Sequence, residues 1–177
     1  MGDHGLINKG PFHFEGLLRV PFLWSWPGHF LEGVMTQGLV SLLDFAPTVL
    51  DLCGVPVPEG EVPAEPEAPL APPPWPGRSL VPQLRGESDA VRHRVVVEND
   101  EDYLGLRLRT LITERYKLTV YPGQPYGELF DLMEDPGEVH NRWNDPAYAT
   151  IRTDLQLALL EELVLTDCVL PRRISHA

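Results

Sequence analysis

The side chains best suited to chemistry gather near the N-terminus, in a stretch rich in glycine. Asp3 and His4 stand side by side in Gly-Asp-His-Gly, and carboxylate and imidazole groups are common ligands of metal ions. More polar residues follow within the first 19 positions: Lys9, His13, Glu15 and Arg19. The residue types alone leave two interpretations open, a cation site or a solvated, glycine-rich loop.

Two other places could carry chemistry, and each has a simpler structural explanation. Residues 134–141 contain acids and a histidine, but Asp-Pro-Gly is typical of a turn, and turns are polar for structural reasons. Cys53 shares one face of a predicted helix with apolar residues, which favours packing over reactivity. Cys168 lies far from Cys53, so the two cysteines predict neither a disulfide framework nor a zinc knuckle.

The elements of the first half are predicted from apolar runs and their end signals. A short apolar and aromatic run that Pro-Gly ends predicts a buried strand at residues 20–26. Residues 41–58 predict a helix, because Asp44 can cap its start and Pro47 fits a first turn. In residues 56–76, nine of the 21 are proline and four are glutamate, a composition typical of an extended loop or linker.

The second half predicts a group of antiparallel strands closed by a helix. After a short helical turn within residues 77–87, the expected elements are a strand at 94–100, a hairpin within 106–123 that turns near Glu114 and Arg115, and a strand at 126–132. The final helix, within residues 144–165, has Asp145 as a predicted N-cap and Pro146 at its first position. Its apolar face is formed by Tyr148, Ile151, Leu155 and Leu159.

Length and charge limit the kind of protein. The 177 residues are enough for one domain with a sizeable core. Asp and Glu number 26 against 14 Lys and Arg, a formal net charge of -12, and the basic residues form no run. Nucleic acids and anionic membranes attract a positive surface, so we expect neither as a partner. No apolar run is long enough to span a bilayer and no signal segment opens the chain, which leaves the localisation open with the cytoplasm as the default.

Five blocks of sequence stand in a specific order along the chain. They are KGPFHFEGLLRVPFLWSWPG, SLLDFAPTVLDLCGVPVP, GRSLVPQLRGE, RTLITERYKLTVYPG and ELFDLMEDPGEVHN. In that order they resemble the C-terminal half of the sulfatase family, within the alkaline phosphatase superfamily. A single block would be a weak signal, but the ordered series is specific.

The resemblance implies an α/β fold, in which part of an alkaline-phosphatase-like sandwich precedes a small antiparallel β-sheet subdomain with a terminal helix. It also implies a division of the chain. Residues 1–55 would end the catalytic α/β domain, 56–76 would be the proline-rich loop or linker, 77–166 the C-terminal α+β subdomain and 167–177 a tail.

The resemblance further implies hydrolysis of sulfate esters. Members of the family use a hydrated formylglycine, made from Cys or Ser in a C/S-x-P-x-R motif, together with a calcium ion and cationic side chains that neutralise charge on the transferred oxygens. This motif belongs to the N-terminal half of such enzymes, so we expect the nucleophile to lie outside this chain. CVLPR at residues 168–172 departs from the motif and falls in the tail. No catalytic residue is therefore predicted within the chain.

Spacing decides how the resemblance treats the Asp-His pair. In sulfatases of the iduronate-sulfatase type, Ser-Asp-His-Gly supplies metal ligands, a Gly-acid-His-Gly stretch follows, and a substrate-binding lysine comes five residues after the second histidine. Lys9 stands five residues after His4, so the match implies that Lys9 binds substrate, with His4 and His13 beside it. The calcium ligands would then lie mostly outside this chain. The alternative takes Asp3 and His4 as metal ligands themselves.

The hypothesis is a sulfatase-family hydrolase of sulfuric esters, represented by its C-terminal part and inactive alone. The expected partners are a sulfate ester substrate and an N-terminal half or other subunit. Two alternatives stay open. One is a phosphonate or phosphodiester hydrolase of the same superfamily, and the other is a truncated product or partner subunit without catalytic function.

Overall fold

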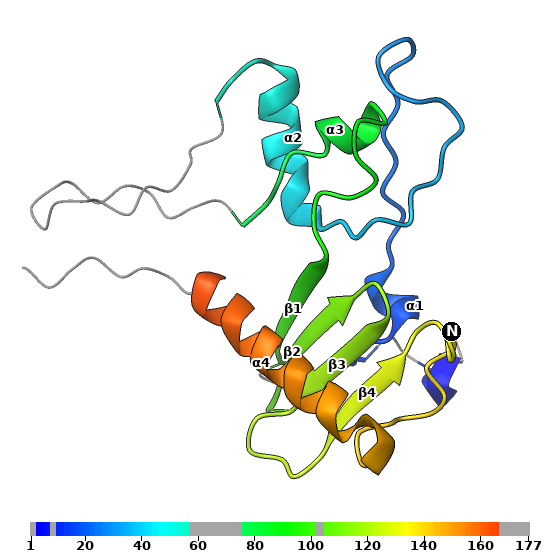
Figure 1. The fold of residues 1–177 in the computed structure, drawn as a ribbon, viewed down its shortest axis with the longest axis vertical. Coiled ribbons are helices and arrows are strands. Elements are labelled where there is room, and N and C mark those ends of the chain that lie inside the picture. Colours follow the sequence, from blue (N-terminus) through cyan, green and yellow to red (C-terminus); the bar gives the residue numbers. More distant parts are fainter. Residues whose placement is uncertain (1–2, 8–9, 57–75, 102–104, 167–177) are drawn as a thin grey trace, which may run out of the picture.

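The chain forms a sheet with a long helix across it and a second group of mainly loop segments, as the computed structural model in Figure 1 shows. The structure describes residues 3–7, 10–56, 76–101 and 105–166. Lys9, most of the proline-rich stretch and the predicted tail with Cys168 lie outside the described residues.

The sheet is an antiparallel meander. Within the described residues it consists of β1 (Arg94–Glu101), β2 (Leu106–Thr113), β3 (Tyr116–Val120) and β4 (Gly127–Asp131), paired in that order. Each strand runs antiparallel to the next, and β2 and β3 turn at Glu114 and Arg115. The strands and the hairpin predicted from alternation are therefore confirmed.

One face of the sheet carries the hydrophobic core. Leu111, Leu118 and Leu129 lie opposite one another in the strand register, and all are fully buried. The helix α4 (Ala149–Thr166) crosses this face (Figure 1) and packs Leu155 and Leu159 against it. Since successive residues of a strand point to opposite faces, this apolar alternation leaves the other face of the sheet for different contacts.

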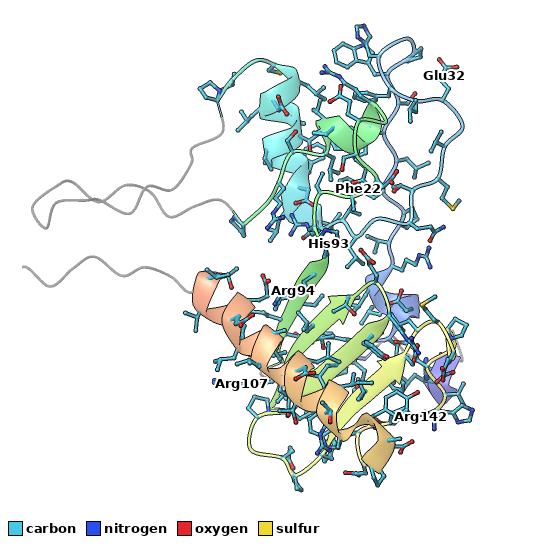
Figure 2. The ribbon with its side chains drawn as sticks, in the orientation of Figure 1. Phe22, Glu32, His93, Arg94, Arg107 and Arg142 are labelled. Carbon is cyan, nitrogen blue, oxygen red and sulfur yellow. The ribbon has the colours of Figure 1, made fainter. Side chains whose placement is uncertain are left out.

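The terminal helix begins where its sequence signals predict. The Asp145 side chain accepts a hydrogen bond from the Ala147 N–H at 3.0 Å and starts the 3-10 turn η3 (Pro146–Tyr148), which runs directly into α4. Near the other end of α4, the Arg94 guanidinium lies 3.2 Å from a Glu161 carboxylate oxygen, and Figure 2 shows Arg94 at the start of β1 beside this helix. None of the helices in the described part of the chain combines the length and hydropathy needed to cross a membrane.

The second group of segments is organised around the buried carboxylate of Asp44. It contains the 3-10 turn η2 (Leu42–Asp44) and the helices α2 (Phe45–Leu52) and α3 (Val81–Leu84), so both the predicted helix and the predicted helical turn are confirmed. Asp44 accepts hydrogen bonds from the Ser41 and Arg78 backbone N–H groups, each at 2.8 Å, and pairs with the Arg92 guanidinium. This carboxylate thereby joins three segments that lie far apart in the sequence.

The prediction of a strand at residues 20–26 is wrong. The described backbone there has no regular structure, and Val20, Leu23 and Trp26 are exposed. A strand requires a neighbouring strand to pair with its N–H and C=O groups. In the described part of the chain, no strand pairs with this segment.

The prediction that Cys53 packs in the helix core is also wrong, because Cys53 is exposed at the C-terminal end of α2. The predicted face also contained Leu43, Pro47 and Leu50, of which Pro47 is buried and Leu50 half-buried, whereas Leu43 is 57% exposed. Thr48 is buried beside Pro47, and its hydroxyl accepts a hydrogen bond from the Leu80 N–H at 2.9 Å. A polar contact thus shares the buried side of the helix with part of the predicted apolar face.

The core gives a prediction for stability. Leu118→Ala should lower the free energy of unfolding by roughly 2–5 kcal/mol, because it opens a cavity among fully buried side chains. Leu157→Ala is the matched control, since Leu157 lies on α4 with 58% of its surface exposed and should change stability by less than about 0.5 kcal/mol. Urea unfolding followed by circular dichroism measures both, and equal effects would contradict the assigned core.

Candidate functional site

The described parts of residues 3–19, here called the N-terminal stretch, lie on the face of the sheet opposite α4. Phe14 contacts Phe130 of β4 with ring centroids 6.3 Å apart, and the short helix α1 (Glu15–Leu18) follows. Phe130 stands next to the core residue Leu129 in the strand, so it points away from α4. The stretch that the sequence singled out thus lies against a defined surface and is not a free loop.

His4 is partly buried on this surface. Its imidazole stacks on the Phe14 ring with centroids 3.6 Å apart and planes 10° apart. Its Nε2 lies 3.9 Å from Oε2 of Glu138. The backbone at His4 has φ 49°, in the left-handed region that few non-glycine residues adopt. Asp3 belongs to the same 3-10 turn, η1 (Asp3–Gly5).

His13 is buried and held in a chain of hydroxyl groups. Only 4% of its surface is exposed, and its Nδ1 lies 2.8 Å from the Thr110 hydroxyl, which in turn lies 2.8 Å from the Thr119 hydroxyl. Burial, and then the positive charges of Lys117 and Arg109, lower the pKa of His13 to about 4. His13 is therefore a neutral imidazole near pH 7.

A buried ammonium lies beside these histidines. The Lys117 side chain on β3 is 1% exposed, and its Nζ pairs with the Glu138 carboxylate and lies 3.4 Å from Oε1 of Glu15. Glu138 is 3% exposed, and its Oε2 accepts a hydrogen bond from the Glu15 N–H at 2.7 Å. A charge buried to this degree needs a partner, because burial removes most of the water that would stabilise it.

A tight turn after β4 brings Glu138 to Lys117. Asp131 ends β4, and its carboxylate accepts hydrogen bonds from the Arg115 guanidinium at 2.7 Å and from the Met133 N–H at 3.2 Å. The hydrogen bonds from Arg115 lower the pKa of Asp131 and favour the charged form that holds the turn. Glu138 has φ 54°, and its N–H donates to the Asp135 carbonyl at 3.0 Å.

A half-buried carboxylate lies on the same face of the sheet. Glu128 on β4 accepts a hydrogen bond from the Tyr121 hydroxyl at 3.0 Å. Burial raises the pKa of Glu128, and burial also raises that of Tyr121. The face of the sheet under the N-terminal stretch is thus polar and titratable, in contrast to the apolar face under α4.

The structure brings together only some of the residues that the sequence singled out. His4 and His13 lie on the same face of the sheet, His4 against Phe14 and His13 against Thr110, whereas Lys9 is outside the described residues. Among the residues that the structure does describe, no group of three or more His, Cys, Asp or Glu side chains is placed to hold a metal ion.

Sequence reasoning missed Lys117 and Glu138. Alternation places Lys117 on the polar face of β3 with Thr119, and such a face is normally exposed to solvent. Glu138 follows Asp-Pro-Gly, and the interpretation of residues 134–141 as a turn is confirmed, yet it gave no reason to expect a buried charge. One signal in the sequence could have indicated a buried partner for Lys117. The N-terminal stretch carries a carboxylate, Glu15, between apolar residues.

Comparison with known proteins agrees with this arrangement. A family model described as N-sulphoglucosamine sulphohydrolase, C-terminal, matches residues 2–164. The chain belongs to this sulfatase family. It is 30% identical over 169 residues to a Delta 4,5-hexuronate-2-O-sulfatase of Bacteroides thetaiotaomicron, and 27% identical over 168 residues to an arylsulfatase of Clostridium perfringens. These matches cover 93% and 92% of this sulfatase chain but 32% and 31% of the relatives, so the chain spans about a third of their length.

Solved structures support the same assignment. The sulfatase chain matches a 2-O GAG sulfatase with a TM-score of 0.53 and 33% identity, over 68% of this chain and 24% of that one. It matches a phosphonate monoester hydrolase of Agrobacterium radiobacter with a TM-score of 0.51 and 26% identity, over 68% and 24% of the two chains. The expected fold class, a sulfatase α/β protein with an antiparallel sheet and a terminal helix, is confirmed.

Burial of His13 predicts a pH-dependent stability. Its folded pKa of about 4 lies below the unfolded value of about 6.5, so the unfolded chain binds more protons between these values. Stability from this group is fully present above about pH 6.5 and is lost as the pH falls towards 4. The expected loss is about 3 kcal/mol by pH 4, since one pKa unit corresponds to about 1.4 kcal/mol.

Urea unfolding between pH 4 and 7 tests this prediction. His13→Gln should flatten the pH dependence, whereas the control His93→Gln should retain it, because His93 is exposed and its Nδ1 lies 2.9 Å from the equally exposed carboxylate of Glu114. An unchanged slope in His13→Gln would contradict the assignment of His13 as a buried neutral group.

Proposed function

We propose that the chain is the C-terminal part of a sulfuric ester hydrolase and that its N-terminal stretch forms a wall of the substrate site. The observation that carries the proposal is the match of residues 2–164 to the sulfatase family model, which includes the whole stretch that bears Lys9, His4 and His13. Buried charges attach that stretch to the sheet, which favours the interpretation as a fixed wall rather than as a mobile loop.

The three candidate substrate-binding residues would act in different ways. A Lys9 ammonium about 4 Å from a sulfate oxygen would contribute about 4 kcal/mol at an effective dielectric constant near 20. His13 is neutral, so it would offer a hydrogen bond and no charge. His4 already lies near Glu138, and it would meet the substrate only through its exposed edge.

We infer that calcium and the formylglycine nucleophile come from outside the described residues. Support comes from the chain covering about a third of its relatives and from the lack, in the described residues, of a three-ligand group. The chain would then act with an N-terminal half or another subunit on a sulfate ester. The net charge of -12 favours neither nucleic acid nor membrane as a partner. Direct ligation of a metal by Asp3 and His4 is the alternative arrangement.

A second candidate activity is hydrolysis of phosphonate or phosphate esters. It is supported by the similarity to a phosphonate monoester hydrolase, because the two activities share the scaffold that this chain forms. The DNA upstream of Met1 separates an enzyme of this superfamily from a product without catalytic function. An in-frame continuation that encodes C/S-x-P-x-R and Ser-Asp-His-Gly supports an enzyme, and a stop codon there supports a truncated product or partner subunit.

Turnover of an aryl sulfate tests the role of the chain. The purified chain with calcium should give no turnover above background, with either an aryl sulfate or a phenylphosphonate ester. Turnover that Lys9→Ala abolishes would contradict the proposal that the nucleophile lies elsewhere.

The longer protein tests the role of Lys9 itself. If the upstream reading frame continues, Lys9→Ala in the joined protein should lower kcat/KM by roughly 100-fold, while Arg107→Ala should leave it unchanged. Arg107 is an exposed cation on β2 that strand alternation places on the same face as Leu111, towards α4 and away from the N-terminal stretch, and so serves as the control. Equal effects of the two changes would contradict a substrate contact at Lys9.

A further inference from the structure

We propose that Lys117 and Glu138 are positioning residues for the N-terminal stretch, so that the small sheet determines where this stretch presents its polar side chains. The inference rests on the proposed function, because the position of the stretch matters for activity only if the stretch forms part of the substrate site. It adds a role for two residues that lie outside the stretch and that do not touch the substrate in the proposed arrangement.

The first argument is that one carboxylate contacts both ends of the stretch. Oε2 of Glu138 lies 3.9 Å from Nε2 of His4 and accepts a hydrogen bond from the Glu15 N–H at 2.7 Å. Residues 5–14 lie between these two contacts along the chain. Glu138 thus holds the Glu15 end by a hydrogen bond and lies beside the His4 end, and a loop fixed near one point at both ends has fewer conformations than a loop fixed at one end.

The second argument is that three separate segments meet at the Lys117 ammonium. Its Nζ pairs with Glu138 from the turn after β4 and lies 3.4 Å from Oε1 of Glu15 from the N-terminal stretch, while the lysine itself belongs to β3. The side chains of Lys117 and Glu138 are 1% and 2% exposed, so solvent cannot replace either partner. Movement of the stretch would break both contacts of Glu15, the one with the Lys117 ammonium and the hydrogen bond to Glu138.

The third argument concerns what such a pair contributes. A buried ion pair stabilises a protein no more than well-packed apolar residues of similar volume, because removing two charges from water costs several kcal/mol. An ion pair differs from apolar packing in requiring particular atoms at particular distances. We therefore infer that this pair determines where the N-terminal stretch lies on the sheet. The aromatic contacts of Phe14 with His4 and Phe130 stabilise its binding to the sheet.

The experiment uses the His4 imidazole as a reporter of position. Because His4 stacks on Phe14 at 3.6 Å, the aromatic ring current should displace its ring-proton resonances in an NMR spectrum of the purified chain. In Glu138→Gln these resonances should move towards those of an unstructured histidine. The Glu15 amide should exchange its hydrogen at least tenfold faster, while amides within β2 and β3 keep their protection.

A single change leaves a buried charge without its partner and can unfold the chain, so a double variant is included. Lys117→Met with Glu138→Gln removes both charges and should keep the fold while it loses the His4 shift. Glu138→Asp keeps the carboxylate and should retain more of the shift than Glu138→Gln. Glu161→Gln is the matched control, because it breaks the exposed pair with Arg94 and should leave His4 and Glu15 as in the parent chain.

A double variant that folds with parental His4 resonances and parental Glu15 exchange would overturn the positioning role. Neither readout uses a substrate. A failure of the proposed function would instead appear in the turnover assay of Lys9→Ala, with the His4 and Glu15 results as predicted here.

Discussion

The Lys117 ammonium lies inside the protein, where water cannot stabilise its charge. The sheet, the turn after β4 and the N-terminal stretch are placed so that they supply its partners. Glu138 must reach it from the turn after β4, and this turn depends on Asp131 and Arg115. Glu15 must reach it from the N-terminal stretch, so the first residues of the chain are drawn onto the sheet. A strand residue, a turn and a terminal segment are in this way linked through one charge.

The two faces of the sheet consequently have different chemistry. Leucines from three strands meet α4 on one face, where packing is tolerant of exchanges between apolar residues of similar size. Hydroxyl, carboxyl, imidazole and ammonium groups meet the N-terminal stretch on the other face. Buried polar groups need hydrogen-bonding or charged partners at defined positions, so this second face restricts more strongly which segment can pack on it.

In the proposed function, this asymmetry would give the small sheet a role in supporting the substrate site. The family match includes both the N-terminal stretch and the sheet that holds it, although more than 80 residues separate His13 from Lys117 in the sequence. A wall of a substrate site gains from rigid support, because oriented groups need no reorganisation when the substrate binds. His13 illustrates the consequence, since its burial keeps the imidazole neutral near pH 7.

By itself the sequence determined the strands, the hairpin and the capped terminal helix, because alternation and end signals are local properties of the chain. It also determined the family, through five ordered blocks. Only the tertiary structure decided that residues 20–26 form no strand, that Cys53 is exposed, and that Lys117 is buried with Glu138. Each of these depends on which distant segment lies alongside: a strand needs a partner strand, a helix face needs a surface to pack on, and a polar strand face becomes buried only when another segment covers it. The N-terminal stretch covers that face, and nothing in the sequence of β3 indicates that another segment packs there.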